Sequence, residues 1–174
     1  MIIAIHGPHN SGKTTFIEQL LKKLKKQRVV VIKNSHLFTL DKENSDTYRY
    51  RNAGANASIL RTKNETIFFV YDTDLDYSLF LAHKFSPDVI LLEGFKDIQN
   101  LDCLMVDMKQ NIKVDDIYKK ILQMKEKNPI EIFAGGRRLP LNSFVQDLYY
   151  KTIKTMVSAL HEGEHQDIEI IIKE

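Results

Sequence analysis

The 174-residue chain has no tryptophan, one cysteine and four prolines, and its charges nearly cancel to a net +2. The single Cys103 cannot form an internal disulfide, which is typical of proteins in a reducing cytoplasm. A balanced charge favours neither nucleic acid nor an anionic membrane as a partner. No apolar run approaches the roughly 20 residues that cross a bilayer, and the opening MIIAI is too short for a signal peptide. We therefore expect a soluble, cytoplasmic protein.

The chain is built from apolar runs that alternate with amphipathic segments. MIIAI and VVVIK, at residues 1–5 and 29–33, predict buried strands, and residues 13–26 between them have apolar side chains at helical spacing. This strand–helix–strand order is typical of a parallel sheet. The alternation continues with predicted strands at 65–72, 88–95 and 101–108 and predicted helices at 45–58, 77–85 and 114–127. The predicted fold class is α/β, with a mainly parallel sheet flanked by helices.

The composition changes near Asn128. Residues 130–140 predict a short strand or hairpin around Gly135-Gly136, residues 142–160 a helix, and residues 167–174 a closing strand. We therefore predict two parts: a nucleotide-binding domain of residues 1–127 and a small α+β C-terminal extension of residues 128–174.

The strongest local motif joins the first predicted strand to the first predicted helix. GPHNSGKT, residues 7–14, fits G-x-x-x-x-G-K-[ST] without a mismatch. Such a P-loop binds phosphate through its backbone N–H groups and the helix dipole, while Lys13 would reach the β- and γ-phosphates and Thr14 would bind Mg²⁺. A plain glycine turn is the alternative, but the flanking strand and helix favour a P-loop NTPase-like fold. The candidate nucleotide-binding residues of this motif are Gly7, Asn10, Ser11, Gly12, Lys13, Thr14 and Thr15.

A second carboxylate at the end of a neighbouring strand usually completes the Mg²⁺ site of such proteins. Glu93 ends the apolar run VILLE and is the candidate, with Asp72 as a weaker rival. The polar stretch 34–46 is too long for a routine connection and is typical of a functional loop. An acidic residue there could support Mg²⁺, and an arginine beside it could neutralise phosphate charge. The candidates are Asp41 and Asp46 for the metal and Arg49 and Arg51 for the nucleotide.

Three blocks of the chain resemble, in order and spacing, the molybdopterin-guanine dinucleotide biosynthesis protein B (MobB) family. They are GPHNSGKTT, the segment VVVIKNSHLFTLDKENSDTYRYRNAGA and VILLEGFK, and they cover about the first hundred residues. Within the second block the matching residues are His36, Phe38, Asp41, Asp46, Thr47, Arg49, Ala53, Gly54 and Ala55. The chain departs from the family at 34–35, where members often carry histidine, and at 44–45, where they carry Gly-Lys.

The resemblance implies a protein that binds GTP with Mg²⁺, hydrolyses it slowly and works as a homodimer. It also implies an adaptor role beside the molybdopterin guanylyltransferase, the enzyme that attaches GMP to molybdopterin. The resemblance also implies that His36 and Asp41 are nucleotide-site residues.

Other functions remain open on the residues alone. No Asn-Lys-x-Asp motif ends a strand, so the preference for guanine or adenine cannot be derived from a local pattern. A small-molecule kinase could use the same P-loop, with Arg49, Arg51 and Arg61 in a lid. A binding module that is regulated by nucleotide, or that no longer uses it, is a further alternative. No general base or arginine finger is evident, which favours slow turnover.

Overall fold

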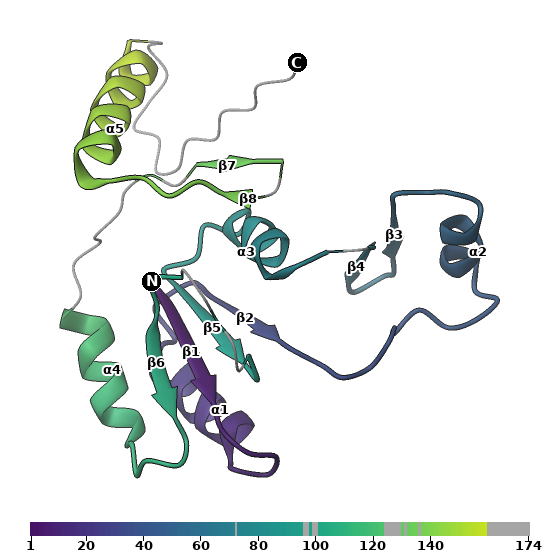
Figure 1. Ribbon diagram of the computed structural model, residues 1–174, viewed down its shortest axis with the longest axis horizontal. Helices are drawn as coiled ribbons and strands as arrows, with labels where there is room; N and C mark the ends of the chain where they lie inside the picture. The colour runs from purple at the N-terminus through teal and green to yellow at the C-terminus, as the bar shows by residue number, and fades with distance from the viewer. Residues whose placement is uncertain are drawn as a thin grey trace.

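The computed structural model describes residues 1–71, 73–95, 98, 101–123, 130, 132–135 and 137–159 (Figure 1). Its elements are, in chain order, β1 (Ile2–His6), α1 (Lys13–Lys23), β2 (Val29–Lys33), α2 (Asp46–Asn52), β3 (Ala57–Arg61), β4 (Thr66–Val70), α3 (Leu75–His83), β5 (Val89–Glu93), β6 (Leu104–Asp107), α4 (Val114–Gln123), β7 (Phe133–Ala134), β8 (Arg137–Arg138) and α5 (Ser143–Ser158).

A four-stranded parallel sheet forms the centre of the molecule, in the order β2-β5-β1-β6. Neighbouring strands of this sheet are not consecutive in the chain, so they are joined by crossover connections. Helix α1 lies in the connection from β1 to β2. All five residues of β5 are buried, because this strand has neighbours on both sides and helices over both faces. The predicted mainly parallel sheet flanked by helices is confirmed.

The strands alternate their side chains between two apolar layers. Ile3, Ile5 and Leu91 pack with α1 and α4 on one face. Ile2 and Leu92 pack with α3 on the opposite face. Because successive side chains of a strand point to opposite faces, this alternation also fixes the side on which the last residue of each strand lies.

A separate unit consists of α2 and the antiparallel ribbon β3–β4, and it projects from the central sheet in Figure 1. The predicted strand at 65–72 is present as β4, but the expectation that it joins the buried parallel strands is wrong. It pairs with β3, which the sequence pattern did not predict, and its Phe68 is 56% exposed. The helix predicted from Ser45 ends at Asn52, because Gly54 follows with a left-handed φ of 100°.

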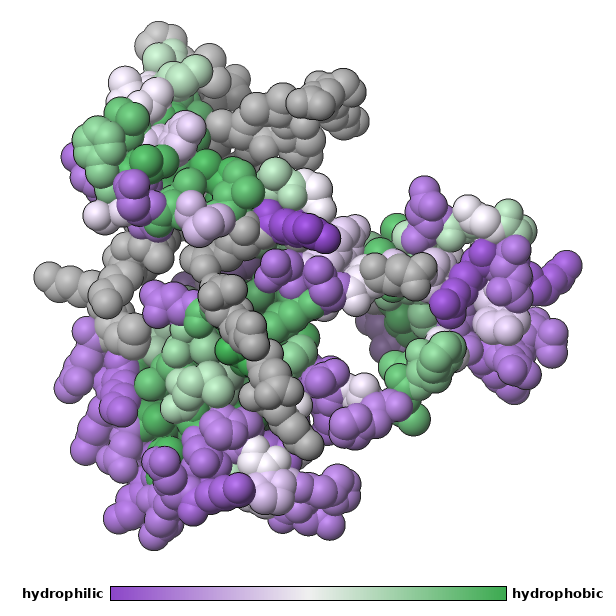
Figure 2. Space-filling model, viewed as in Figure 1, coloured by the Kyte–Doolittle hydropathy of each residue, from purple (hydrophilic) through white to green (hydrophobic). Residues whose placement is uncertain are grey.

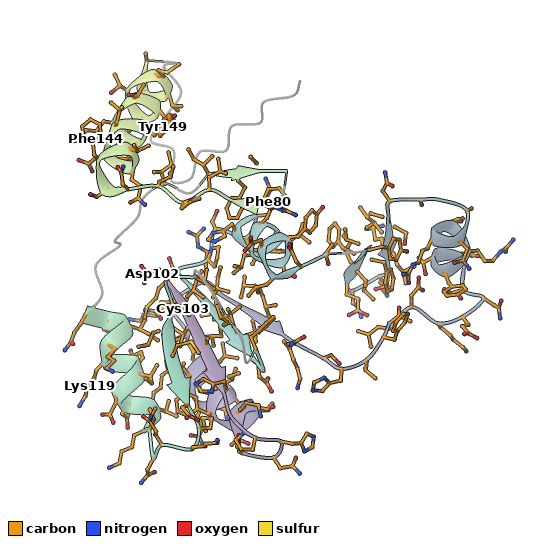
Figure 3. All side chains as sticks on the ribbon, in the orientation of Figure 1. Phe80, Asp102, Cys103, Lys119, Phe144 and Tyr149 are labelled. Atoms are coloured by element: carbon orange, nitrogen blue, oxygen red, sulfur yellow. The ribbon has the colours of Figure 1, made fainter. Side chains whose placement is uncertain are left out.

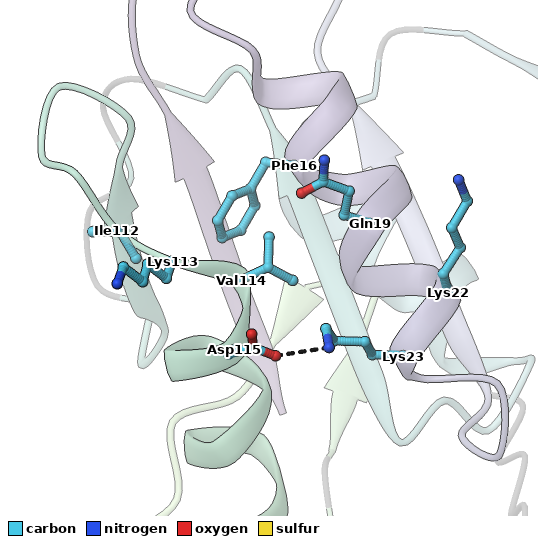
Figure 4. Close-up of a pocket in the computed structure, with 8 residues that line it drawn as sticks. All are labelled: Phe16, Gln19, Lys22, Lys23, Ile112, Lys113, Val114 and Asp115. Carbon is cyan, nitrogen blue, oxygen red and sulfur yellow. Dashed lines mark ion pairs between the residues drawn. The ribbon is translucent and has the colours of Figure 1, made fainter.

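The first predicted helix is shorter than expected, and the end of the helix predicted at 114–127 lies outside the described residues. α1 ends at Lys23, with Leu24 as its C-cap, and α4 is described as far as Gln123. The two helices lie side by side, and Lys23 Nζ lies 2.7 Å from Asp115 Oδ1 across them (Figure 4). The ammonium of Lys23 holds the pKa of the Asp115 carboxyl below its ordinary value through this hydrogen bond.

The predicted C-terminal hairpin and helix are confirmed as β7–β8 and α5. Phe133 of the hairpin makes an edge-on contact with Phe80 of α3, at a ring-centroid distance of 5.5 Å. Figure 2 shows hydrophobic surface over α5, where Phe144 and Met156 are exposed. The predicted strand 167–174 and the predicted domain boundary at 127/128 lie outside the described residues.

Cys103 is half-buried just before β6 (Figure 3). Burial, with a smaller contribution from the Asp102 carboxylate, raises the pKa of its thiol. Because the thiolate is the nucleophilic form, this environment is that of an unreactive cysteine. Among the described helices, none is long and apolar enough to cross a bilayer.

Candidate functional site

A tight glycine loop connects β1 to α1 at the carboxyl edge of the sheet. Gly7 and Gly12 have φ angles of 154° and 80°, and Asn10 has a φ of 60°. A side chain at Gly7 could not fit, because a Cβ there would lie 2.8 Å from both Met108 Cβ and Ser11 Oγ. The loop conformation and the crowding together explain why glycine stands at this position.

The first turn of α1 begins in this loop, and no side chain caps its N–H groups. Gly12 is its N-cap and provides no side-chain hydrogen bond to the helix. The first N–H groups of a helix have no partner inside the helix and carry the positive end of its dipole, so they attract anions. Ser11 Oγ is buried beside them without a hydrogen-bond partner. The loop therefore has the donors that a phosphate needs.

Lys13 reaches back over the loop. Its Nζ donates hydrogen bonds to the carbonyl oxygens of Gly7, at 3.1 Å, and Pro8, at 2.6 Å. The ammonium thus lies over the loop, on carbonyl groups that a phosphate oxygen could replace as its partner.

The structure brings Thr14 and Glu93 together from positions 79 residues apart. Thr14 Oγ1 donates a hydrogen bond to Glu93 Oε1 at 3.0 Å. Glu93 shares a face of the sheet with Leu91, two residues earlier, which packs against α1. Its side chain therefore points to the first turn of α1, and the residue is only 6% exposed.

The Thr14 hydroxyl and the Glu93 carboxylate fit a magnesium ion chemically. Mg²⁺ prefers oxygen ligands and is commonly held by one or two carboxylates together with nucleotide phosphates and water. Within the described chain, no group of three or more His, Cys, Asp or Glu residues could hold a metal ion by itself. A metal at this edge of the sheet would thus take its further ligands from water and a bound phosphate.

The candidate residues of the long loop lie elsewhere. Asp41 is 4% exposed, and its Oδ1 accepts hydrogen bonds from Ser45 Oγ at 2.8 Å and Thr47 Oγ1 at 2.7 Å. Arg49 is exposed and lies 3.6 Å from Asp46 Oδ1. His36 is exposed.

None of these three loop residues has a described hydrogen bond or ion pair to the glycine loop or to Glu93. The structure therefore brings together the motif residues and Glu93 but not the loop residues. Thr15 and Asn10 are exposed at the edge of the motif. The rival Asp72 and Lys96, the last residue of the block VILLEGFK, lie outside the described residues.

Sequence reasoning missed one neighbour of the site. Lys33 Nζ lies 3.4 Å from Glu93 Oε1. The available signal was its place as the last residue of a strand, since a neighbouring parallel strand ends in Glu93.

A G-x-x-x-x-G-K-[ST] loop between the first strand of a parallel sheet and the helix that follows is typical of the P-loop NTPase-like class of α/β proteins. The family profile "Molybdopterin guanine dinucleotide synthesis protein B" (MobB) matches residues 2–123. The chain belongs to this family.

Curated relatives agree with the family. A molybdopterin-guanine dinucleotide biosynthesis adapter protein of Haemophilus influenzae is 33% identical over 138 residues, which cover 75% of this chain and 77% of that protein. A putative adapter protein of the same description from Methanocaldococcus jannaschii is 38% identical over 96 residues. That match covers 55% of this chain but only 41% of the archaeal protein, so the chain spans less than half of that relative.

A solved structure of Bacillus subtilis MobB is similar at 19% identity and a TM-score of 0.45, over 68% of this chain and 96% of that one. The fold assignment depends on the sheet order and the glycine loop described above.

Proposed function

We propose that the chain is an adapter protein of molybdenum-cofactor biosynthesis that binds GTP with Mg²⁺ at the loop 7–14. The observation that carries this proposal is the 3.0 Å hydrogen bond between Thr14 Oγ1 and Glu93 Oε1. Two oxygen ligands of the kind that Mg²⁺ prefers meet beside a helix N-terminus with uncapped donors. The groups proposed to bind phosphate and metal thus share one edge of the sheet.

The chain's own groups have distinct tasks in this proposal. The N–H groups of residues 7–14 would hold the phosphates, and Lys13 would exchange the carbonyl oxygens of Gly7 and Pro8 for phosphate oxygens. Thr14 and Glu93 would hold Mg²⁺, directly or through water. When bound, the metal neutralises charge on the phosphates and aids transfer of the terminal phosphoryl group.

Hydrolysis is proposed to be slow. A stabilising arginine accelerates phosphoryl transfer in this class by roughly 10³- to 10⁵-fold. The described hydrogen bonds and ion pairs of the glycine loop include no arginine, and Arg49 pairs with Asp46 on α2 instead. Slow turnover is more typical of a regulated adapter than of a small-molecule kinase. The kinase is the alternative function.

The partners are proposed from the names of the relatives, which are adapter proteins of molybdopterin-guanine dinucleotide biosynthesis. The molybdopterin guanylyltransferase is the corresponding partner, and the cytoplasm the corresponding compartment. A homodimer is also proposed. An isolated two-stranded ribbon is marginal in water, yet β3–β4 exposes Ile59 and Phe68. A second copy of the chain would cover this apolar surface.

Calorimetry with GTP and ATP, each with and without Mg²⁺, tests this proposal together with a turnover assay. We expect GTP to bind more tightly than ATP, Mg²⁺ to strengthen binding, and hydrolysis to proceed well below one turnover per minute. A clear preference for ATP would contradict the guanine assignment. Rapid transfer of phosphate to a small acceptor would favour the kinase, and no binding of either nucleotide would refute the proposal.

A further inference from the structure

The buried carboxylate of Glu93 has a cationic neighbour that the proposed function does not use. Lys33 Nζ lies 3.4 Å from Glu93 Oε1, the same oxygen that accepts the hydrogen bond of Thr14. Glu93 Oε1 thus accepts a hydrogen bond from a hydroxyl and pairs with an ammonium at the place where the proposed metal would bind.

The sheet itself fixes the backbone of Lys33 beside Glu93. Lys33 and Glu93 are register partners in the parallel pair β2–β5, so their side chains point to the same face. The ladder continues past the strand ends, where Asn34 N–H donates to the Glu93 carbonyl oxygen at 2.9 Å. Strand register therefore places the Lys33 side chain within reach of the Glu93 carboxylate.

The two side chains differ sharply in burial. The Glu93 side chain is 9% exposed and the Lys33 side chain 60% exposed. A buried carboxylate without a positive partner is costly, whereas a long lysine side chain can leave its partner and remain in water. Of the pair, Glu93 is the fixed member and Lys33 the displaceable one.

An ammonium and a divalent cation repel each other at such distances, and they compete for the same oxygen. We propose that Lys33 is the counter-ion of Glu93 in the metal-free protein and that it gives up Oε1 when Mg²⁺ and nucleotide bind. Lys33 is then a positioning residue: it keeps Glu93 beside Thr14 before the metal arrives, and it sets the Mg²⁺ concentration at which the site fills. This inference depends on the proposed function.

The test measures how much Mg²⁺ is needed to reach half of the gain in GTP affinity. Lys33→Met removes the ammonium and keeps the length of the side chain, and Lys33→Arg retains the charge. Lys26→Met, at an exposed lysine beyond the end of α1, is the matched control.

We expect the Mg²⁺ midpoint of Lys33→Met to fall by roughly two- to fivefold, the range set by the strength of a partly exposed ion pair. Lys33→Arg should restore the wild-type midpoint, and Lys26→Met should not change it. An unchanged midpoint in Lys33→Met would overturn the proposal. A raised midpoint, or an equal loss of GTP affinity with and without Mg²⁺, would also overturn it, because Lys33 would then be a ligand of the bound nucleotide.

A second measurement separates this inference from the proposed function. In nucleotide-free protein, thermal unfolding of Lys33→Met, Glu93→Gln and the double variant forms a double-mutant cycle. We expect the double variant to lose less stability than the sum of the two single losses. Additive losses would overturn the counter-ion assignment even if GTP binds. Conversely, a wild-type protein that binds no GTP would refute the proposed function, while the cycle would still decide whether Lys33 is coupled to Glu93.

Discussion

The central sheet and the projecting unit α2–β3–β4 differ in the burial of their apolar side chains and in the number of neighbours of each strand. In the sheet, Ile3, Ile5 and Leu91 are fully buried, and parallel neighbours fix the register of every strand. In the projecting unit, Ile59 and Phe68 are 62% and 56% exposed, and each strand has one described neighbour. The proposed metal and phosphate site lies entirely at the edge of the central sheet. The exposed apolar surface of the projecting unit is suited to contacts with another chain.

The largest expected difference between the two regions is in stability. Leu91→Ala removes a fully buried side chain from the layer under α1 and should lower the free energy of unfolding by about 2–5 kcal/mol. Phe68→Ala removes a half-exposed ring and should lower it by less than about 1 kcal/mol in the monomer. Urea unfolding at low protein concentration measures both. Equal losses would contradict the assignment of Phe68 to an uncovered surface.

The second difference is in nucleotide binding. Lys13→Ala removes charged hydrogen bonds to phosphate and should weaken GTP binding by about 1.5–3 kcal/mol, roughly 10- to 150-fold. His36→Ala, in the exposed loop, should change affinity less than twofold unless binding draws that loop to the phosphates. Calorimetry of both variants measures this contrast. A large loss in His36→Ala would show that the loop residues implied by the family resemblance close over the nucleotide.

The third difference concerns the start of α2. Ser45 caps this helix by accepting a hydrogen bond from Tyr48 N–H at 3.2 Å, and it donates to the buried Asp41 at 2.8 Å. Ser45→Ala should cost about 1 kcal/mol and should act on this unit first. Hydrogen exchange should therefore speed up at the amides of α2 and remain unchanged at those of β5. Uniform acceleration would show that the two regions unfold as one.

The smallest expected effect is at the pair that joins α1 to α4. Lys23→Met should raise the pKa of Asp115 toward its ordinary value, which an NMR titration of the carboxyl carbon detects. Because the folded pKa of Asp115 is the lowered one, its small stabilising effect is present at neutral pH. That effect is lost as the pH falls through the lowered value. A pKa that stays low in Lys23→Met would assign the shift to other lysines.

The sequence predicts the central sheet well, because buried parallel strands are apolar over their whole length. VILLE has this composition up to its final Glu93 and is buried throughout, and the glycine motif marks the turn between strand and helix. The prediction that VVVIK is also a buried strand is wrong, because β2 has only one described neighbour in the sheet and none of its residues is buried. The ribbon was harder to predict. ASILR has one buried residue, Ser58, and so lacks the pattern of a core strand. Its pairing with β4 depends on tertiary contacts that no local pattern contains.

The site also contains residues that the sequence predicts and residues that depend on the folded structure. Thr14 and Glu93 are predictable because strand ends and the glycine motif place them at one edge. Lys33 is not, since its relation to Glu93 depends on the strand order β2-β5-β1, which the sequence leaves open. The buried hydrogen bonds of Asp41 to Ser45 and Thr47 are likewise a product of the folded loop.

The most direct test of the account is the Mg²⁺ dependence of GTP affinity in Glu93→Gln. Glutamine keeps the shape of the side chain but removes the negative charge that would hold the metal. We predict that Mg²⁺ strengthens GTP binding at least tenfold less in Glu93→Gln than in the wild type, while affinity without Mg²⁺ changes little; Glu18→Gln, on α1, should behave as wild type. An undiminished Mg²⁺ effect in Glu93→Gln would contradict the central claim that Thr14 and Glu93 form the metal site.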